Sequence, residues 1–193
     1  MYIVLDLARE RVTSRRFSDR PVDVGDVLPA IEAASQAPSG ANYQPWRFLI
    51  VTESELKTRI REASEEGERR FYSRVEGAWA EWLELNDLNP RKPYLENAPL
   101  LVIVLSHREA PYSKESVWLA IGYILLALQE LGLATVTYTP SDPDLVLDVL
   151  DVPENLSLEA ILPVGYPDDD KQKEERFELS QLYRINRWND TEN

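Results

Sequence analysis

Cysteine is absent from this sequence of 193 residues, and histidine occurs once, as His107. A chain without cysteine forms no disulfide, has no thiolate nucleophile and holds neither an iron–sulfur cluster nor a cysteine-ligated zinc ion. A single histidine also excludes a histidine-rich metal site, and we predict no metal site. Because His107 follows the apolar run LVIVLS, we expect it at a strand end or in a loop rather than in catalysis. This composition fits the cytoplasm best.

Lysine is scarce, since five of the 21 basic residues are lysines and the other 16 are arginines. Acidic residues give the chain a net charge of −13, which argues against a nucleic-acid partner because phosphates need a basic surface. Long apolar runs are also missing, so we expect no membrane-spanning helix. The N-terminal run MYIVLDL is too short for a signal peptide, and its positive charges follow the run instead of preceding it.

Two phosphate-binding signatures are absent as well. The sequence contains neither a GxGxxG motif nor a GxxxxGK motif followed by Ser or Thr. A Rossmann dinucleotide site and a P-loop kinase are therefore not supported. The length is that of one domain, and 44% of the residues are hydrophobic, so we expect residues 1–193 to form a single domain.

Hydrophobic periodicity predicts helices and strands in turn along the chain. Residues 23–37 show the pattern of an amphipathic helix with Asp23 as its cap, and residues 46–52 that of a buried strand. A charged helix follows, with a continuation through Tyr72 and Trp82 in which Gly67 and Gly77 permit bends. The other expected elements are strands at 97–106, 134–139 and 158–164 and helices at 113–131 and 140–150.

Glu68, Tyr72 and Lys92 bring an anion, a phenol and a cation to one charged segment. Glu68 and Tyr72 are four residues apart and so share one face of a helix. A carboxylate can hold an ammonium group and a lysine can hold a carboxylate, so this trio could clamp an amino acid at both charged ends. The alternative, favoured when the trio is taken alone, is a solvated helix face and a surface lysine. Residues 65–95 are the candidate lid of such a site.

Three further segments offer groups to a cofactor. Arg11 and Arg15 lie among hydroxyl-bearing residues in RVTSRRF, a composition suited to phosphate, although a basic helix end explains it equally well. The turn at residues 38–42 has small residues that let backbone approach a flat ring, or it is a simple structural turn. In residues 135–139, hydroxyls alternate along one side of a strand and could face a cofactor, although threonine is common in strands.

Taken together and in this order, the segments resemble the flavin-dependent nitroreductase superfamily over nearly the whole chain. The resemblance rests on RVTSRRFS, APSGANYQPWRFLIV, the long apolar helix followed by GLATVTYTP, and LPVGYP with an arginine downstream. The spacing of Glu68 and Tyr72, with the lysine of KPYLENAP, is similar to the iodotyrosine deiodinase branch. This resemblance implies an α+β fold with a mixed central sheet flanked by helices. It also implies an intertwined homodimer in which residues 168–193 reach the partner subunit.

A member of that branch is expected to bind flavin mononucleotide (FMN). Thr139 matches the hydroxyl that hydrogen-bonds flavin N5, which makes it the expected catalytic residue. Val12 departs from the family because it replaces a basic residue, and Tyr43 and Gln44 vary the turn. Carried over by position, the FMN-binding residues are Arg11, Thr13 and Arg15 near the phosphate and ribityl chain, Pro38, Ser39 and Gly40 along the flavin, Thr137 and Thr139 at the isoalloxazine, and Arg176 as the final phosphate ligand.

The resemblance also implies a substrate and a reaction. Glu68, Tyr72 and Lys92 would bind the zwitterion of a halogenated tyrosine, and the backbone of Ala41 would meet its phenolate. Reduced FMN would convert iodotyrosine, and also bromo- and chlorotyrosine, to tyrosine and halide. NAD(P)H or a reductase would then reduce the FMN again. Two alternatives stay open: a general NAD(P)H-dependent nitroreductase or quinone reductase that needs no trio, and a flavin- or amino-acid-binding sensor without turnover.

Overall fold

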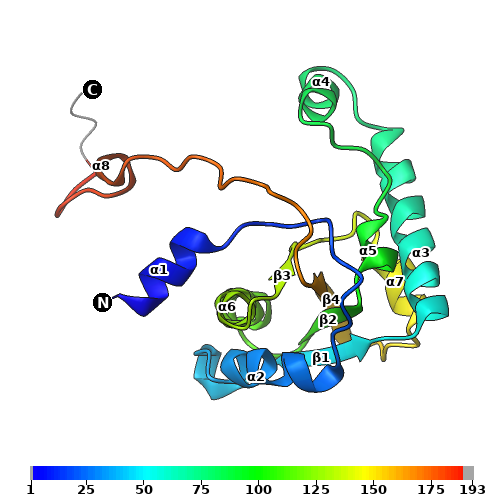
Figure 1. The fold of residues 1–193 in the computed structure, drawn as a ribbon, viewed down its shortest axis with the longest axis horizontal. Helices are drawn as coiled ribbons and strands as arrows, with labels where there is room; N and C mark the ends of the chain where they lie inside the picture. The colour runs from blue at the N-terminus through cyan, green and yellow to red at the C-terminus, as the bar shows by residue number, and fades with distance from the viewer. Residues whose placement is uncertain (1, 189–193) are drawn as a thin grey trace.

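The structure is a computed structural model that describes residues 2–188 (Figure 1). Helices and strands are interspersed along the chain, which is the α+β class predicted from the sequence. The strands are β1 (Trp46–Val51), β2 (Leu100–His107), β3 (Ala134–Thr135) and β4 (Leu156–Gly165). The helices are α1 (Ile3–Glu10), α2 (Val24–Ser35), the short 3-10 helix η1 (Gly40–Asn42), α3 (Ser54–Tyr72), α4 (Ala78–Leu85), α5 (Tyr94–Asn97), α6 (Ser113–Glu130), α7 (Pro143–Val149) and α8 (Leu179–Leu182).

The strands form one sheet in the order β1-β2-β4-β3, and each neighbouring pair is antiparallel. The resemblance predicts a mixed sheet, but parallel pairing among the described residues is limited to an isolated bridge between Thr13 and Thr135. The reason is the path of the chain. Val51 at the end of β1 pairs with Leu101 near the start of β2, so α3, α4 and α5 return the chain to the end of the sheet that it left.

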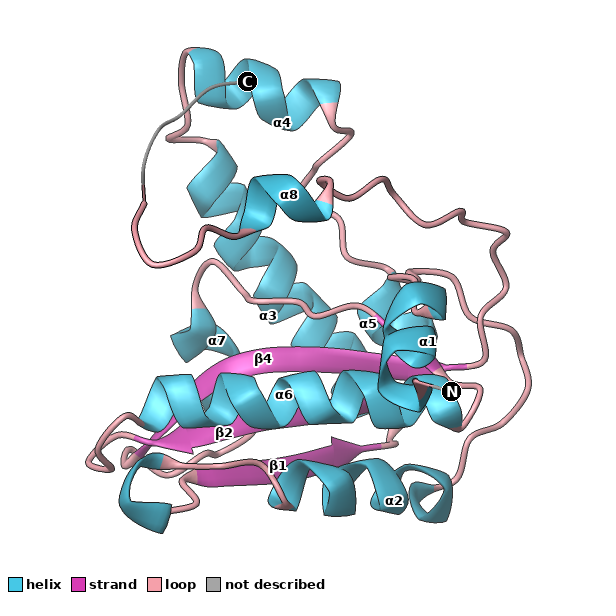
Figure 2. Ribbon diagram, turned by 90° about the vertical axis from the view of Figure 1, so that its left-hand side faces the viewer, coloured by secondary structure: helices cyan, strands magenta, loops and turns pink. Residues whose placement is uncertain are grey.

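Strand β2 is buried along its length and separates two hydrophobic cores. Its even-numbered residues from Leu100 to Val104 pack with α2 and α6, and its odd-numbered residues from Leu101 to Leu105 pack with α3, α5 and α7. This alternation follows from the two-residue period of a strand. Figure 2 shows α6 lying across one face of the sheet with α3 and α7 behind it. Both faces are covered, which leaves the ends and edges of the sheet for ligand sites.

Most predicted elements are present, with shifted ends. Helix α2 begins where expected, and Asp26 accepts a hydrogen bond from the backbone N–H of Asp23 at 2.9 Å in a capping box. The strand expected at 134–139 is shorter, because regular pairing stops after β3 and resumes only as an isolated bridge between Tyr138 and Ile161. Histidine 107 ends β2, as predicted. Helices α1, α5 and α8 are not predicted from the sequence.

The segment 65–95 is not one continuous helix. Helix α3 ends at Tyr72, and α4 begins after Gly77, whose φ of +67° is a left-handed conformation that glycine adopts without strain. Figure 1 shows α4 standing away from the sheet beyond the end of α3. Gly67 lies inside α3 without breaking it. A Cβ at Gly67 would lie 2.8 Å from the Cβ of Asp142, so glycine here lets the chain before α7 pack closely against α3.

The described residues near each end of the chain expose apolar side chains. In Figure 1 the segment that carries α8 runs away from the sheet toward the side of α1, opposite α3. Residues 168–175 are largely exposed, as expected of an acidic stretch, and residues 189–193 of the predicted C-terminal extension lie outside the described residues. Within the described residues, no helix is long and apolar enough to cross a bilayer. The exposed apolar side chains include Tyr2, Ile3 and Val4 near the start and Phe177, Leu179, Leu182, Ile185 and Trp188 near the end.

Candidate active site

The predicted trio lines a single cavity. Glu68 lies near the end of α3, Tyr72 is its last residue, and Lys92 lies in the loop before α5. The alternative of a solvated helix face and a surface lysine is wrong, because the side chains of Glu68 and Lys92 are only 7% and 11% exposed. The cavity has a volume of about 510 Å³ and is lined by Arg15, Glu68, Tyr72, Asp87, Leu88, Asn89, Arg91, Lys92, Pro93, Tyr94 and Tyr138.

The two carboxylate oxygens of Glu68 have different partners. Oε1 accepts hydrogen bonds from the Tyr138 hydroxyl at 2.9 Å, the Ser141 hydroxyl at 3.0 Å and the Ser141 backbone N–H at 3.3 Å. Oε2 instead lies 3.6 Å from Nζ of Lys92. Oε1 is therefore committed to the protein, and Oε2 is the oxygen that an incoming cation can share.

Lys92 and Tyr72 complete the polar surface of the cavity. Burial lowers the pKa of the Lys92 ammonium, and the Glu68 carboxylate, which raises it, offsets this effect only in part. Nζ of Lys92 also donates a hydrogen bond to the carbonyl of Asn89 and lies 5.8 Å from the centre of the Tyr72 ring. Burial and the charge of Glu68 raise the pKa of the Tyr72 phenol, which keeps it protonated at neutral pH. The cavity thus offers a carboxylate, an ammonium and a phenol hydroxyl together.

Two tyrosines that the sequence analysis does not single out form the buried wall of the cavity. The rings of Tyr94 and Tyr138 meet edge to face with their centres 6.0 Å apart. Burial raises the pKa of both phenols, so the Tyr138 hydroxyl keeps the proton that it donates to Glu68. The sequence signal that could have identified Tyr138 is the alternation of buried and more exposed side chains along its extended segment. That alternation buries Tyr138 and leaves Thr137 and Thr139, the predicted flavin contacts, on the accessible side.

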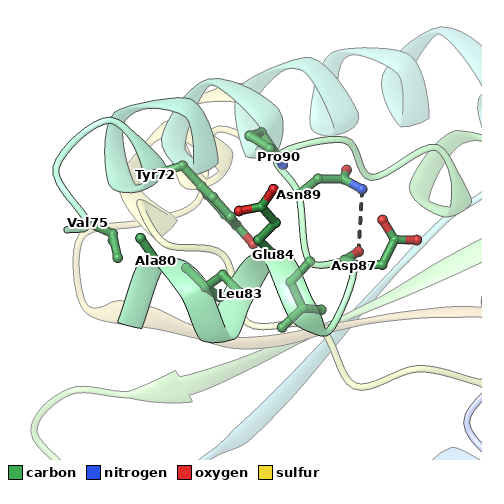
Figure 3. Close-up of a pocket in the computed structure, with 9 residues that line it drawn as sticks. Tyr72, Val75, Ala80, Leu83, Glu84, Asp87, Asn89 and Pro90 are labelled. Carbon is green, nitrogen blue, oxygen red and sulfur yellow. Dashed lines mark hydrogen bonds between the residues drawn. The ribbon is translucent and has the colours of Figure 1, made fainter. Parts of the chain in front are cut away.

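A second cavity, of about 340 Å³, adjoins the first between the end of α3 and α4 (Figure 3). The two cavities share Tyr72, Asp87, Leu88 and Asn89 in their walls. Figure 3 shows the Tyr72 side chain reaching from α3 toward Glu84 on α4 and marks the hydrogen bond from Asn89 Nδ2 to the Asp87 carbonyl. The predicted lid segment therefore builds the walls of both cavities.

The predicted phosphate ligands Arg11, Thr13 and Arg176 meet in a small pocket beside α1. Burial and the positive charge of Arg176 lower the pKa of Arg11, and burial together with these two arginines lowers the pKa of Lys173. Such crowding of positive charge is relieved by an anion, and a phosphate supplies several acceptor oxygens for these donors. Lys171 and Lys173 also line the pocket and are candidates that sequence reasoning missed. The lining includes one carboxylate, Glu174, which accepts a hydrogen bond from Lys171 at 2.8 Å and so leaves Lys173 and the two arginines for an anion.

Arg15 lies apart from this pocket and lines the trio cavity instead. Arg11 and Arg15 flank the bridge between Thr13 and Thr135, and four residues of extended chain span about 13 Å. The two arginines that the resemblance groups together therefore lie at different places: Arg11 lines the phosphate pocket, and Arg15 lines the trio cavity.

Residues 38–41 lie against the start of α6. The backbone N–H of Gly40 donates to the Ser116 hydroxyl at 3.2 Å, and a Cβ at Gly40 would lie 2.8 Å from the Tyr112 ring. Ala41 has a φ of +50°, a strained conformation for a residue other than glycine. The lining of the trio cavity includes no residue of 38–41. One copy of the chain therefore does not bring Ala41 to the trio.

Comparison with known proteins identifies the family. The sequence model of the Nitroreductase family matches residues 8–166. The chain is 49% identical over 183 residues to the iodotyrosine deiodinase of Thermotoga neapolitana, covering 95% of this chain and 98% of that protein. The chain belongs to the iodotyrosine deiodinase branch of the nitroreductase family. This confirms the family predicted from the sequence.

Two further matches agree with this membership of the deiodinase branch. The iodotyrosine deiodinase of Haliscomenobacter hydrossis is 34% identical over 189 residues, covering 90% of this chain and 85% of that protein. The crystal structure of an oxidized iodotyrosine deiodinase bound to FMN and 3-iodo-L-tyrosine superposes with a TM-score of 0.90. It is 48% identical and covers 96% of this chain and 100% of that chain. The predicted nitroreductase-like fold is therefore confirmed.

Proposed function

We propose that this chain is an FMN-dependent oxidoreductase that removes halogen from halotyrosines, converting iodotyrosine to tyrosine and iodide and accepting bromo- and chlorotyrosine as well. The observation that carries the proposal is the buried pair of Glu68 and Lys92 beside Tyr72 in one cavity. It occurs in a chain 48% identical to a deiodinase whose crystal structure contains both FMN and 3-iodo-L-tyrosine.

The two charges of an amino acid fit this pair. Glu68 Oε2 binds the ammonium of the substrate, Lys92 binds its carboxylate, and Tyr72 hydrogen-bonds or stacks beside them. Without substrate, the two side chains neutralise each other at 3.6 Å. The ammonium of a zwitterion replaces Lys92 as the partner of Glu68, and its carboxylate replaces Glu68 as the partner of Lys92. Binding therefore leaves no buried charge unpaired.

FMN is the cofactor, and the chain offers groups for its charged end. Arg11, Thr13 and Arg176 hold the phosphate, joined by Lys173, because the crowded positive charges of this pocket suit a dianion. Arg15 follows about 13 Å along the extended segment and so lies toward the ring end of an elongated ligand. When bound and reduced, FMN supplies the electrons of the reaction.

The remaining contacts come from the accessible hydroxyls and from a second copy of the chain. Thr137 and Thr139 face the isoalloxazine, with Thr139 at N5. Residues 38–40 line the flavin and Ala41 meets the phenolate from the partner subunit of a homodimer, because these residues lie away from the trio of their own chain. Residues 168–188, the described part of the predicted C-terminal extension, reach across the same interface. The exposed apolar side chains of α1 and of the C-terminal segment support a dimer that buries them.

Within the closed site, the chain's own groups bind and orient the substrate. Halogenated phenols ionise more readily than tyrosine, and the backbone N–H of Ala41 stabilises the phenolate as a hydrogen-bond donor. Closure of residues 65–95 excludes water and holds the phenol ring in place. Each turnover breaks one carbon–halogen bond, takes up two electrons and one proton, and releases one halide ion and one tyrosine.

The electron donor of this proposal is NAD(P)H or a separate reductase, acting in the cytoplasm. Mixing the purified enzyme with NADH or NADPH without oxygen separates the two sources. Rapid bleaching of the flavin absorbance marks direct use of the nicotinamide, and a flavin that stays oxidized assigns the step to a reductase.

The decisive experiment is anaerobic. The FMN-loaded protein is reduced with dithionite, 3-iodotyrosine is added, and flavin reoxidation is followed together with tyrosine and iodide. One tyrosine and one iodide per reduced flavin supports the proposal, and Glu68→Gln should slow the reaction at low substrate concentration while keeping its FMN. A flavin that stays reduced with 3-iodotyrosine but reoxidises with a nitroaromatic acceptor would instead make the protein a general reductase. Tight binding of 3-iodotyrosine without iodide release would make it a sensor.

A further inference from the structure

The backbone of Lys92 is held by α3, as is its side chain. The backbone N–H of Lys92 donates a hydrogen bond of 2.8 Å to Oε1 of Glu65. Glu65 precedes Glu68 by three residues, so the two carboxylates lie on one side of α3. The Glu65 side chain is only 12% exposed. One helix face therefore contacts Lys92 twice, through Glu68 at the ammonium and through Glu65 at the backbone.

A chain of polar contacts fixes Glu65 in turn. Arg61 donates from Nη1 to Glu65 Oε2 at 2.9 Å and from Nε to Glu96 Oε2 at 2.6 Å. Thr58 donates to the other oxygen of Glu96 at 2.8 Å. Because Glu96 lies in α5, directly after the Lys92 loop, Arg61 connects the helix on which Glu65 sits to the element that follows the loop. Such connected charged hydrogen bonds restrict the rotamers of every member.

Helix α5 has an independent anchor. The buried Lys57 donates from Nζ to the carbonyls of Ala98 and Pro99 at 2.5 and 3.3 Å, which holds the chain at the end of α5 to α3. Loss of Glu65 therefore leaves α5 attached and loosens mainly the loop of residues 86–93. The effect of Glu65 should then appear in the placement of Lys92 rather than in the fold.

We propose that Glu65 is a positioning residue for substrate binding, which sets the place of the Lys92 ammonium before the substrate arrives. Arg61 and Glu96 keep Glu65 itself in place. This inference rests on the proposed function, since it assigns the substrate carboxylate to Lys92. A loop that is already held costs no further ordering when a ligand binds, whereas a loose loop must be ordered by the substrate at the expense of affinity.

The test compares wild type, Glu65→Ala and Glu65→Gln as FMN-loaded proteins, with Glu66→Gln as the matched control. Glu66 is the next residue of α3, but it pairs with the exposed Arg69 and Arg70 and not with the loop. Quenching of flavin fluorescence gives the affinity for 3-iodotyrosine and for 3-iodotyramine, which lacks the carboxylate. Hydrogen exchange of peptides from residues 86–93 reports the loop directly, and FMN content reports the cofactor site.

We expect Glu65→Ala to bind 3-iodotyrosine about tenfold or more weakly, as for the loss of a hydrogen bond to a charged group, while 3-iodotyramine binding changes much less. Hydrogen exchange should rise in residues 86–93, and FMN content should stay constant. Glu65→Gln should lie between wild type and Glu65→Ala, because its amide oxygen still accepts the Lys92 N–H. Glu66→Gln should match wild type.

Equal affinity of wild type and Glu65→Ala for 3-iodotyrosine would overturn the inference. An equal loss for both ligands would overturn it too, because that marks a general loosening of the site. If Glu65→Ala folds poorly, Glu65→Gln carries the test, and unchanged exchange and affinity in that variant would refute the role. A wild-type protein that does not bind 3-iodotyrosine would sink the proposed function and this inference together, and wild type alone reveals that outcome.

Discussion

Replacing Lys92 by methionine should change which ligand the site prefers. In wild type, Glu68 and Lys92 neutralise each other 3.6 Å apart, and 3-iodotyrosine offers a partner to both. 3-Iodotyramine has the ammonium group without the carboxylate. Its ammonium pairs with Glu68, and the Lys92 ammonium is left without an anionic partner. In Lys92→Met that penalty is gone, while the carboxylate of 3-iodotyrosine has lost its partner.

The burial of the pair sets the size of the effect. The two side chains are only 7% and 11% exposed, so water screens them little. Leaving a buried polar or charged group unpaired costs about 1–3 kcal/mol, which is roughly a 5- to 140-fold change in affinity. We expect wild type to prefer 3-iodotyrosine by that factor and Lys92→Met to bind 3-iodotyramine at least as tightly as 3-iodotyrosine. Since Glu68 Oε1 keeps its three hydrogen bonds, the loss of folding stability should fall below the roughly 3–5 kcal/mol typical of a broken buried pair.

The assay titrates both ligands into FMN-loaded wild type, Lys92→Met and Lys114→Met and follows flavin fluorescence. Lys114 is an exposed lysine on α6, so Lys114→Met removes the same charge at a position outside the cavity lining and should keep the wild-type ratio of the two affinities. Thermal melts of the same samples give the stability change. A Lys92→Met protein with the wild-type ratio would refute the assignment of Lys92 to the carboxylate.

Three other predictions follow from the same contacts. Burial lowers the pKa of Lys92 and a bound carboxylate favours its charged form, so 3-iodotyrosine affinity should fall as the pH rises toward the ordinary lysine range. Lys92→Arg, which stays charged, should flatten that fall, and identical pH profiles would contradict the argument. Arg176→Ala and Lys173→Ala should each weaken FMN binding to the apoprotein about tenfold or more by fluorescence titration, and unchanged affinity in both would exclude the phosphate pocket. Tyr138→Phe should lower the free energy of unfolding by about 1–2 kcal/mol in urea and weaken 3-iodotyrosine binding, and wild-type values for both would show that Ser141 alone satisfies Glu68.

The sequence predicts those parts of the site whose signals are local. The four-residue spacing of Glu68 and Tyr72 is a helical signal, and α3 does place them together. The hydrogen bond from Tyr138 to Glu68 joins residues 70 positions apart, and periodicity says nothing about such a contact. The alternation of the Tyr138 segment predicts its burial but not its partner. The burial of Lys92 likewise depends on a loop that folds back on α3, which no short-range pattern encodes.

The two proposed ligands meet opposite electrostatic conditions within one acidic chain. The Glu68–Lys92 pair is neutral as a unit, so a zwitterion enters it without changing the local charge. Among residues 2–188, the one acidic side chain in the lining of the phosphate pocket, Glu174, forms its ion pair with Lys171 and not with Arg11, Lys173 or Arg176. Burial, together with the repulsion among these three cations, lowers the pKa of Arg11 and Lys173. An anionic group is therefore attracted to this pocket although the whole chain carries a charge of −13. Salt screens charges more than about 10 Å away, so the nearby cations determine the local attraction. The same reasoning explains why an anionic cofactor and a net-neutral substrate can bind at the two ends of one extended segment without competing for the same charges.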